Sequence, residues 1–331
     1  MNRKRYFELD RMNVLYCLIV VFIHVFGIYT SRLTHTAQQV VFAAFMKNCA
    51  FVVQGFMFLS AAKYSLIYKD KKIKYIKFIW SRIKKVVIPY VICVAVYYVV
   101  YCFLGYVAEP SLSELGMYIF NGTLSAQFYF VIAILQFYVL LPLWIWVSKK
   151  VDSALLVGAS FVIYGIWLYN FAGICLFFDR VFITYLPFWA MGLAAGRHYT
   201  KFESKTKSNT IALLVFFALM YFVNGFAKNI VYINPVCLEA IHTLYCVSAI
   251  LLTYVLCSLS HKKLSLVVGG INGLSFHIYL WHCLLLPFID MGMNKISFSA
   301  LWQEALFRAG AMYIIIISAA LINGIINKRR K

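Results

Sequence analysis

His24 is an ionisable side chain inside an apolar run. It stands within the stretch Val20–Phe26, and the run that contains it begins near Met12. At 1.5 Å per residue, His24 lies roughly 16–18 Å along a helix, near the middle of a hydrocarbon core of about 30 Å. An ionisable group at that depth is costly and usually marks a functional site.

A neutral imidazole can act as a general base or as an acyl-accepting nucleophile. Burial away from water favours this neutral form of His24. The alternative is a structural histidine whose ring hydrogen bonds to a neighbouring carbonyl or hydroxyl group. Both roles stay open for a lone histidine, so the residues at fixed distances from it must be considered.

Asp10 and Asn13 precede His24 at a spacing that has a physical meaning. Eleven helical steps of about 100° bring Asn13 and His24 onto nearly the same face, about three turns apart. Arg11 lies two residues before Asn13 and falls on roughly the opposite face. An amide near one end of the helix and a histidine at mid-membrane would then line one wall of a cleft.

Composition predicts the helices that position these residues. Hydrophobic residues make up 63% of the 331 residues, and charged residues make up 13%. In soluble globular domains about a quarter of the residues are charged, so this composition excludes a soluble domain. Apolar runs of about 20 residues, long enough to cross a bilayer, recur along the chain. We expect an all-α polytopic membrane helix bundle, a single domain over residues 1–331. About ten transmembrane helices are expected, at 12–30, 42–66, 86–107, 125–148, 153–171, 178–196, 209–227, 237–258, 268–289 and 301–326.

Basic residues cluster at alternate gaps between the apolar runs, and these clusters account for the net charge of +20. By the positive-inside rule, both termini and the 69–85 segment are predicted to be cytoplasmic, and the loop at 107–123 is predicted to be outside. The charge therefore indicates topology and attraction to membrane lipid, and no nucleic acid partner. Lys69–Arg82 mixes basic and large apolar residues, which predicts an amphipathic helix in the membrane interface.

No metal site is predicted. The nine cysteines nearly all lie inside apolar runs and form no Cys-x-x-Cys pair, which favours a packing role. His277 and His282 are five residues apart, about 140° around a helix, so they cannot bind one ligand as a pair. His282 is expected either to donate a hydrogen bond in helix packing or to line the same cavity as His24.

Six segments, in this order, resemble the acyltransferase-3 family. In the first, Asp10 and His24 match the family pattern of Asp-x-x-Arg, ten residues and His, whereas Asn13 stands in place of the Arg. The other five are Phe56–Ala61, Arg82–Tyr90, Gln127–Phe130 with Pro142, Arg180 with Tyr185–Gly192, and Leu274–His282. The resemblance covers most of the chain.

The resemblance implies an enzyme of the bacterial inner membrane. Its members transfer an acetyl or other small acyl group from a cytoplasmic acyl-CoA, typically acetyl-CoA, to a hydroxyl of a cell-surface or lipid-linked glycan. The acyl-CoA is a donor substrate, and no bound cofactor is expected. His24 would either deprotonate the acceptor hydroxyl or carry the acyl group briefly. Asp10, Asn13 and His282 would complete the catalytic site.

Basic and aromatic residues receive further implied roles. Arg82 and Lys85 would bind the phosphates of the donor nucleotide, a role that suits basic groups at the cytoplasmic face. Their simpler role is to anchor the topology. Arg180 would pair with Asp179 or Glu239, or touch a sugar. The implied substrate contacts are Arg180, Tyr129, Tyr279 and Ser275.

The short chain and Asn13 also resemble the smaller branch of the family that is linked to exopolysaccharide operons. Members of that branch have been viewed both as glycan acyltransferases and as exporters. A polysaccharide or lipid-linked sugar exporter is therefore the second hypothesis. The sequence shows no internal repeat and no pair of broken helices of the transporter kind, which favours the acyltransferase.

Overall fold

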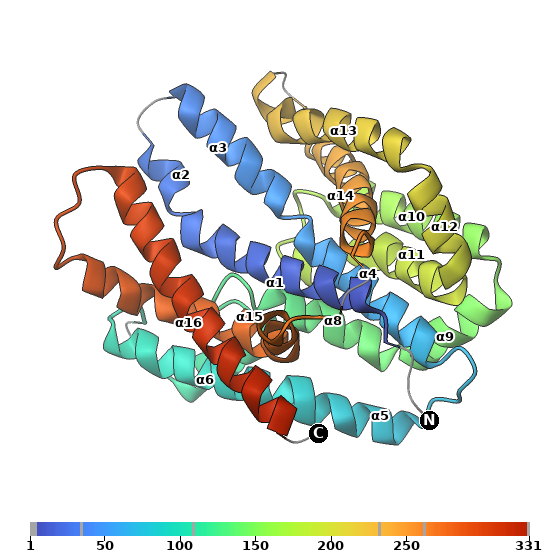
Figure 1. The fold of residues 1–331 in the computed structure, drawn as a ribbon, viewed down its shortest axis with the longest axis horizontal. Coiled ribbons are helices and arrows are strands. Elements are labelled where there is room, and N and C mark those ends of the chain that lie inside the picture. Colours follow the sequence, from blue (N-terminus) through green and yellow to red (C-terminus); the bar gives the residue numbers. More distant parts are fainter. Residues whose placement is uncertain (1–4, 34–35, 108–109, 231–232, 261–262, 330–331) are drawn as a thin grey trace. The chain divides into compact units, whose positions relative to one another are not determined.

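The computed structural model describes residues 5–33, 36–107, 110–230, 233–260 and 263–329. Every regular element in these ranges is helical, which confirms the all-α prediction (Figure 1). The helices fall into two compact units. One consists of Met1–Leu59 with Thr200–Lys331, and the other of Ser60–Tyr199. The first unit is thus built from the two ends of the chain and the second from its middle.

Seven helices in the described ranges are long and apolar enough to cross a membrane. Two bent helix pairs raise the number to nine if each pair is one span. The polytopic helical architecture is therefore confirmed. The seven single spans are Phe7–Arg32, Ala37–Ile67, Tyr75–Phe103, Ser153–Phe171, Pro235–Ser258, Leu266–Met293 and Leu301–Arg329.

The segment expected as the sixth span does not form one long helix. Two 3₁₀ turns, η2 (Phe178–Arg180) and η3 (Phe182–Tyr185), precede the 12-residue helix α11 (Leu186–Arg197). Pro187 lies in the first turn of α11, a place where its missing N–H leaves no bond unmade. Twelve residues rise only about 18 Å, which is too short for a bilayer core.

One further expectation is wrong, and another stays a prediction. The helix expected at 69–82 begins only at Tyr75 and continues through a π-helical turn at Ile83–Val87, so that Tyr75–Phe103 is one candidate span. Its place in the membrane interface stays a prediction. The sequence also indicated no pair of broken helices. In the structure, however, the two helices on either side of Leu140 are bent by 59° relative to each other, and the two on either side of Asn209 by 74°. At the first break, Pro142 lacks the N–H that would continue the hydrogen-bond ladder.

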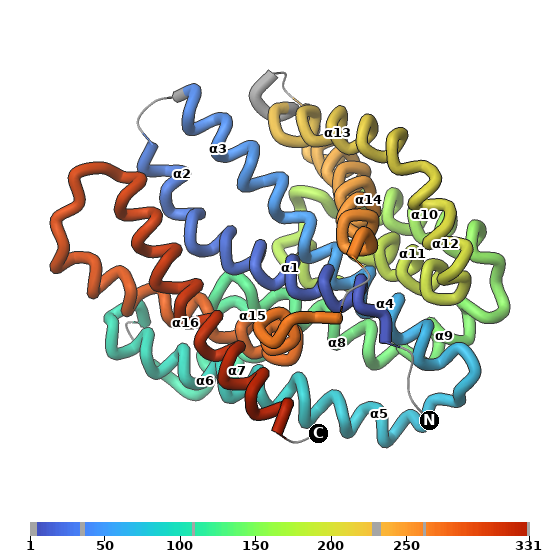
Figure 2. Tube along the Cα trace, viewed as in Figure 1, coloured from blue at the N-terminus to red at the C-terminus, as the bar shows by residue number. Residues whose placement is uncertain are grey.

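Three helices of the first unit share one hydrophobic core. α1 (Phe7–Phe26), α15 (Leu266–Met293) and α16 (Leu301–Arg329) bury apolar side chains against one another, among them Val21 and Met312. Figure 2 traces the three helices as neighbours, α1 in blue and the other two in orange and red. The unit also contains α2 (Tyr29–Arg32), α3 (Thr36–Cys49), the first half of α4 (Val52–Ile67), most of α12 (Tyr199–Ser208), α13 (Thr210–Ile230) and α14 (Pro235–Ser258).

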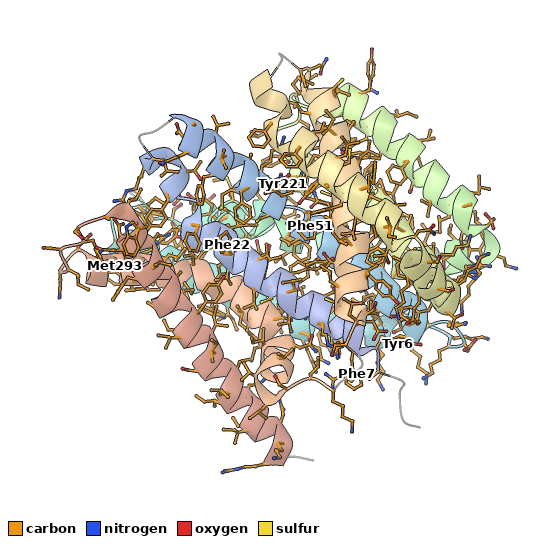
Figure 3. The ribbon with its side chains drawn as sticks, turned by 45° about the horizontal axis from the view of Figure 1, so that its top comes forward. Tyr6, Phe7, Phe22, Phe51, Tyr221 and Met293 are labelled. Atoms are coloured by element: carbon orange, nitrogen blue, oxygen red, sulfur yellow. The ribbon has the colours of Figure 1, made fainter. Side chains whose placement is uncertain are left out.

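An aromatic cluster ties α14 to its neighbours in the same unit. The ring of Tyr245 on α14 lies 6.3 Å from Phe51 and 6.3 Å from Tyr221 of α13, measured between centroids. Phe51 in turn lies 5.6 Å from Tyr16 of α1. Figure 3 labels Phe51 and Tyr221 and shows the density of side chains around them. The Tyr245 hydroxyl donates to the Asn48 carbonyl at 2.9 Å, so its polar end is also satisfied.

The second unit has short helices with capped ends. Ser111 accepts from the Glu114 N–H at the start of α7 (Leu112–Asn121), and Gly122, with a positive φ of 63°, caps the other end. Asp152 caps α10, and the N–H groups of Leu155 and Ala154 lower the pKa of that carboxyl. The remaining elements of the unit are α5 (Tyr75–Arg82), η1 (Ile83–Val87), α6 (Ile88–Phe103), α7 (Leu112–Asn121), α8 (Tyr129–Val139), α9 (Leu141–Lys150) and α10 (Ser153–Phe171).

Small residues allow α15 and α16 to approach closely. A Cβ at Gly270 would lie 2.0 Å from the Ala320 carbonyl oxygen, and a Cβ at Gly324 would lie 2.8 Å from that of Leu266. On α16 the contacting positions, Ala320 and Gly324, form the small-xxx-small pattern of packed membrane helices, and on α15 they are Leu266 and Gly270. Gly269 is adjacent to Gly270, but a Cβ there meets nothing within 4 Å.

Gly270→Ala is therefore expected to destabilise the protein, and Gly269→Ala is expected to be tolerated. The first change forces two helix backbones apart, an overpacking cost of about 1–3 kcal/mol. The second adds only helix propensity, worth up to about 1 kcal/mol. Thermal unfolding of the detergent-solubilised variants measures both. Equal melting temperatures would contradict the close packing of α15 on α16.

Candidate functional site

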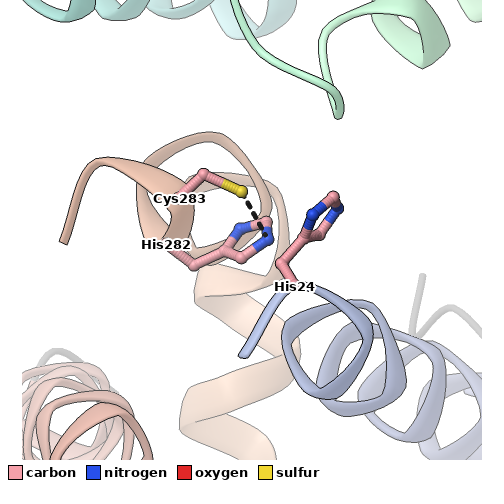
Figure 4. A group of neighbouring side chains, drawn as sticks. All are labelled: His24, His282 and Cys283. Atoms are coloured by element: carbon pink, nitrogen blue, oxygen red, sulfur yellow. Dashed lines mark hydrogen bonds between the residues drawn. The ribbon is translucent and has the colours of Figure 1, made fainter. Parts of the chain in front are cut away.

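The structure places His24 of α1 beside His282 and Cys283 of α15 (Figure 4). The two imidazole centroids lie 5.0 Å apart. One ring nitrogen of each histidine and the cysteine sulfur all lie within 4.8 Å of one another. His282 and Cys283 are buried, and His24 is partly buried. All three belong to the first unit.

Hydrogen bonds define the proton position on His282. Its Nδ1 lies 3.0 Å from the Ile278 carbonyl oxygen and 2.9 Å from that of Tyr279. Carbonyl oxygens only accept, so Nδ1 must hold the proton and donate it. The Nε2 atom of neutral His282 is then an acceptor, and it lies 3.3 Å from the Cys283 sulfur. The thiol is therefore the donor in that contact.

His24 differs from a satisfied core histidine. Among the residues that the structure describes, no hydrogen bond reaches its ring, and the ring contact it makes is with His282. In a buried structural histidine, at least one ring nitrogen is expected to form a hydrogen bond with a carbonyl or hydroxyl group. The nitrogens of His24 are instead left for a substrate or for the facing pair on α15.

Arg308 positions the end of α1 that holds His24. Its guanidinium donates to the carbonyl oxygens of Val25 and His24, the latter at 3.4 Å. Two more bonds, at 2.6 and 2.8 Å, join it to the carboxylate of Asp290 on α15. Arg308 is only 5% exposed. A bidentate pair that also caps carbonyls is a rigid arrangement.

Pro287 modifies α15 next to the site. It lies inside the helix, four residues after Cys283. Because proline has no N–H, the Cys283 carbonyl lacks its ordinary helical partner. The helix is thus locally loosened at the turn that presents His282 and Cys283.

Asn13 contacts α15 as well, two helical turns before His282. Its amide nitrogen donates to the Asn272 side-chain oxygen and to the Ser275 hydroxyl, both at 2.9 Å. Asn13 and His24 therefore both face α15, as their spacing on α1 suggested. Asp10 instead forms an ion pair with Arg5 at 2.7 Å. Asp10 is not part of the group of side chains around His24.

Asn272 also lines a cavity of about 680 Å³. Lys263, Lys328 and Arg5 contribute positive charge to its wall. Gly269 lines the same cavity, where it faces open space. The cavity belongs to the same unit as His24 and lies near the Asn13 end of α1.

Arg82 lies in an aromatic box of the second unit. Its guanidinium carbon lies 5.3–6.0 Å from the centroids of Tyr64, Phe78 and Tyr138. It donates to the Tyr64 hydroxyl at 2.8 Å, and no described carboxylate pairs with it. Its buried Nε has no hydrogen-bond partner among the described residues. Lys85 is exposed on the π-helical turn that follows, a feature frequent at functional sites.

The predicted substrate contacts do not form one group. Arg180 pairs with Asp179 at 2.5 Å and donates to the Asn121 carbonyl at 2.6 Å, so it is engaged in holding the second unit together. Tyr129 is in the same unit, where it hydrogen bonds to Tyr185. Tyr279 lies in the first unit, with its ring 6.3 Å from that of His282.

Sequence reasoning missed three residues of the site. Cys283 directly follows His282, and it was grouped with the packing cysteines. Arg308 and Asp290 are charged residues within or at the end of apolar runs, the same signal that identified His24. Their pairing depends on two helices meeting, which the spacing along either helix does not contain.

The arrangement supports several kinds of chemistry. His24 can accept a proton, and Cys283 beside His282 is a thiol paired with a base. Two imidazoles and a thiol are also a ligand set that suits zinc. The absence of a metal site remains a prediction. His277, on the same helix, is exposed and lies outside this group.

Comparison with known families assigns the chain. Residues 6–324 match the family described as acyltransferase domain, acyltransferase-3. No curated protein and no solved structure matches the chain. The matched range covers nearly all of both compact units and includes His24, Arg82, His282, Cys283 and Arg308. The chain therefore belongs to the acyltransferase-3 family, and it is a multi-pass membrane acyltransferase.

Proposed function

We propose that this enzyme transfers an acetyl or other small acyl group from acyl-CoA to a hydroxyl of a cell-surface or lipid-linked glycan, as an exopolysaccharide-modifying protein of the bacterial inner membrane. The observation that supports this most is His24, which lies in a membrane span and whose ring has no hydrogen bond to any residue that the structure describes. An ionisable side chain is costly to place in a membrane span, and a role in proton transfer gives its ring nitrogens a function that accounts for that cost.

His24 takes the proton of the acceptor hydroxyl. Removing that proton makes the oxygen a competent nucleophile toward the acyl carbonyl. Arg308 and Asp290 keep the end of α1 in place, so the imidazole is presented at a fixed position. Nearer the start of α1, Asn13 hydrogen bonds to Asn272 and Ser275 of α15. Asn13 stands at the position where the family pattern has an arginine.

Arg82 and Lys85 bind the phosphates of the donor nucleotide. Arg82 has no described carboxylate partner and a buried Nε without a hydrogen bond, so an anion would supply what the guanidinium lacks. A second basic region, the cavity walled by Lys263 and Lys328, is the competing location for the donor. The aromatic box favours Arg82 because it removes the cation from water.

An exporter is the second candidate. The two bent helix pairs are an observation in its favour, because discontinuous spans are common in transporters. An exporter, however, gives no role to the arrangement of two histidines and a thiol within a membrane span. The reaction itself separates the two candidates.

His24→Gln is expected to lower glycan acylation by roughly 10²–10⁴-fold, since the amide keeps hydrogen bonding but cannot accept a proton at neutral pH. Transfer from radiolabelled acyl-CoA to glycan in reconstituted vesicles measures the rate. His277→Gln, on an exposed face of α15, is the matched control and should retain activity. Near-normal acylation by His24→Gln would make the residue structural. Polysaccharide export without acylation by the unaltered protein would favour the exporter.

Replacing both Arg82 and Lys85 with Gln should raise the KM for acyl-CoA by about tenfold or more, because each charge-assisted bond to phosphate is worth about 1.5–3 kcal/mol. The KM for the glycan should change little. The matched variant replaces Lys263 and Lys328 with Gln. A larger effect on acyl-CoA in that second variant would move the donor site to the cavity in the first unit.

Both termini and the 69–74 segment are proposed to be cytoplasmic, with α7 outside. Terminal residues 1–4 and 330–331, which contribute to the basic clusters, lie outside the described ranges. In a cysteine-free background, Leu112→Cys should react with an impermeant thiol reagent in intact cells, because Leu112 is 87% exposed. Lys71→Cys should react only after lysis. The reverse pattern would invert the proposed orientation.

A further inference from the structure

We propose that Cys283 accepts the acyl group from the donor and holds it as a thioester until the glycan hydroxyl arrives. This rests on the proposed function and identifies its covalent intermediate. Three observations support it: the thiol contacts a nitrogen acceptor, the proton on that histidine is placed by the helix backbone, and a second histidine faces the pair.

The pairing of Cys283 with His282 is that of a nucleophile and its base. The sulfur lies 3.3 Å from Nε2, and Nδ1 is held by two carbonyl oxygens at 2.9 and 3.0 Å. Those carbonyls also stabilise the imidazolium that forms when Nε2 takes the thiol proton. A thiolate generated this way is the reactive form of cysteine.

The first half-reaction is an exchange of thioesters. Nε2 of His282 removes the thiol proton, and the Cys283 sulfur attacks the acyl carbonyl of acyl-CoA. The new carbon–sulfur bond forms as the bond to the CoA sulfur breaks. The departing CoA thiolate takes the proton back from His282, so the products are S-acyl-Cys283 and CoA.

The second half-reaction uses the other histidine. His24 removes the proton of the glycan hydroxyl, whose oxygen attacks the Cys283 thioester. The carbon–sulfur bond breaks, and the Cys283 thiolate recovers its proton from His24, which lies within 4.8 Å of it. His282 thus transfers the thiol proton in the first half-reaction, and His24 transfers the hydroxyl proton in the second. The donor can leave before the acceptor binds, which suits a small, largely buried site between substrates from opposite sides of the membrane.

The same unit contains a pair that serves as a control. On α14, the Cys246 sulfur lies 3.4 Å from Nε2 of His242. Nδ1 of His242 faces the Asn224 side-chain oxygen at 3.3 Å, and no second histidine is grouped with this pair among the described residues. Cys246 therefore reproduces the local contact without the facing base. A thioester at Cys283 and none at Cys246 is the specific expectation.

The test uses the full-length protein in nanodiscs with radiolabelled acetyl-CoA and no acceptor. Label should bind covalently to the protein, be released by neutral hydroxylamine, and map to the peptide that contains Cys283. Cys283→Ala should lose both this label and glycan acylation, to background. Cys246→Ala should keep both. His24→Gln should accumulate label that it cannot pass to the glycan.

Several results would overturn the proposal. Full glycan acylation by Cys283→Ala or Cys283→Ser leaves the proposed function intact but removes the covalent intermediate. Stoichiometric zinc bound through His24, His282 and Cys283 would make the thiol a metal ligand instead of a carrier. Failure of the unaltered protein to acylate either itself or the glycan removes the intermediate and the proposed function together. Label at Cys283 without transfer to the glycan supports the intermediate and changes only the acceptor.

Discussion

Helix ends in this protein are satisfied by buried or partly buried arginines. A bilayer offers no water to the last carbonyls of a helix, so each must find a partner inside the protein. Arg308 donates to the end of α1 and Arg11 to the Cys257 carbonyl at the end of α14. In the second unit, Arg197 does the same for α9 and Arg180 for α7. These contacts let short and broken helices exist within an apolar bundle.

His24 and Arg82 do not take part in these helix-end contacts through their own ring or guanidinium among the described residues. His24 lies next to carbonyls that Arg308 has already engaged, and its own ring has no hydrogen bond among the described residues. Arg82 has hydroxyl and aromatic neighbours but no described carboxylate and no helix-end carbonyl among its partners. Because helix-end carbonyls are satisfied by other arginines, these two groups are candidates for contact with a ligand or for a role in a reaction.

The close approach of α15 and α16 is what makes the site rigid. Gly270 and Gly324 allow the two backbones to come together, and the same two helices provide Asp290 and Arg308. Arg308 then reaches across to α1 behind His24. Pro287 loosens the turn of α15 that presents His282 and Cys283. Small residues on α15 and α16 therefore let the Arg308–Asp290 pair hold the end of α1 that contains His24.

The sequence by itself determined the class of protein and most of the membrane spans, and it singled out His24 as a candidate site residue, because hydropathy and the cost of a buried ionisable group are local properties. Helical spacing also put Asn13 and His24 on one face, and both do contact α15. The structure alone revealed the 3₁₀ turns before α11, the continuous helix from Tyr75, the Arg308–Asp290 pair and the place of Cys283. These depend on how each helix is rotated and which helix it meets, and packing between distant segments decides that.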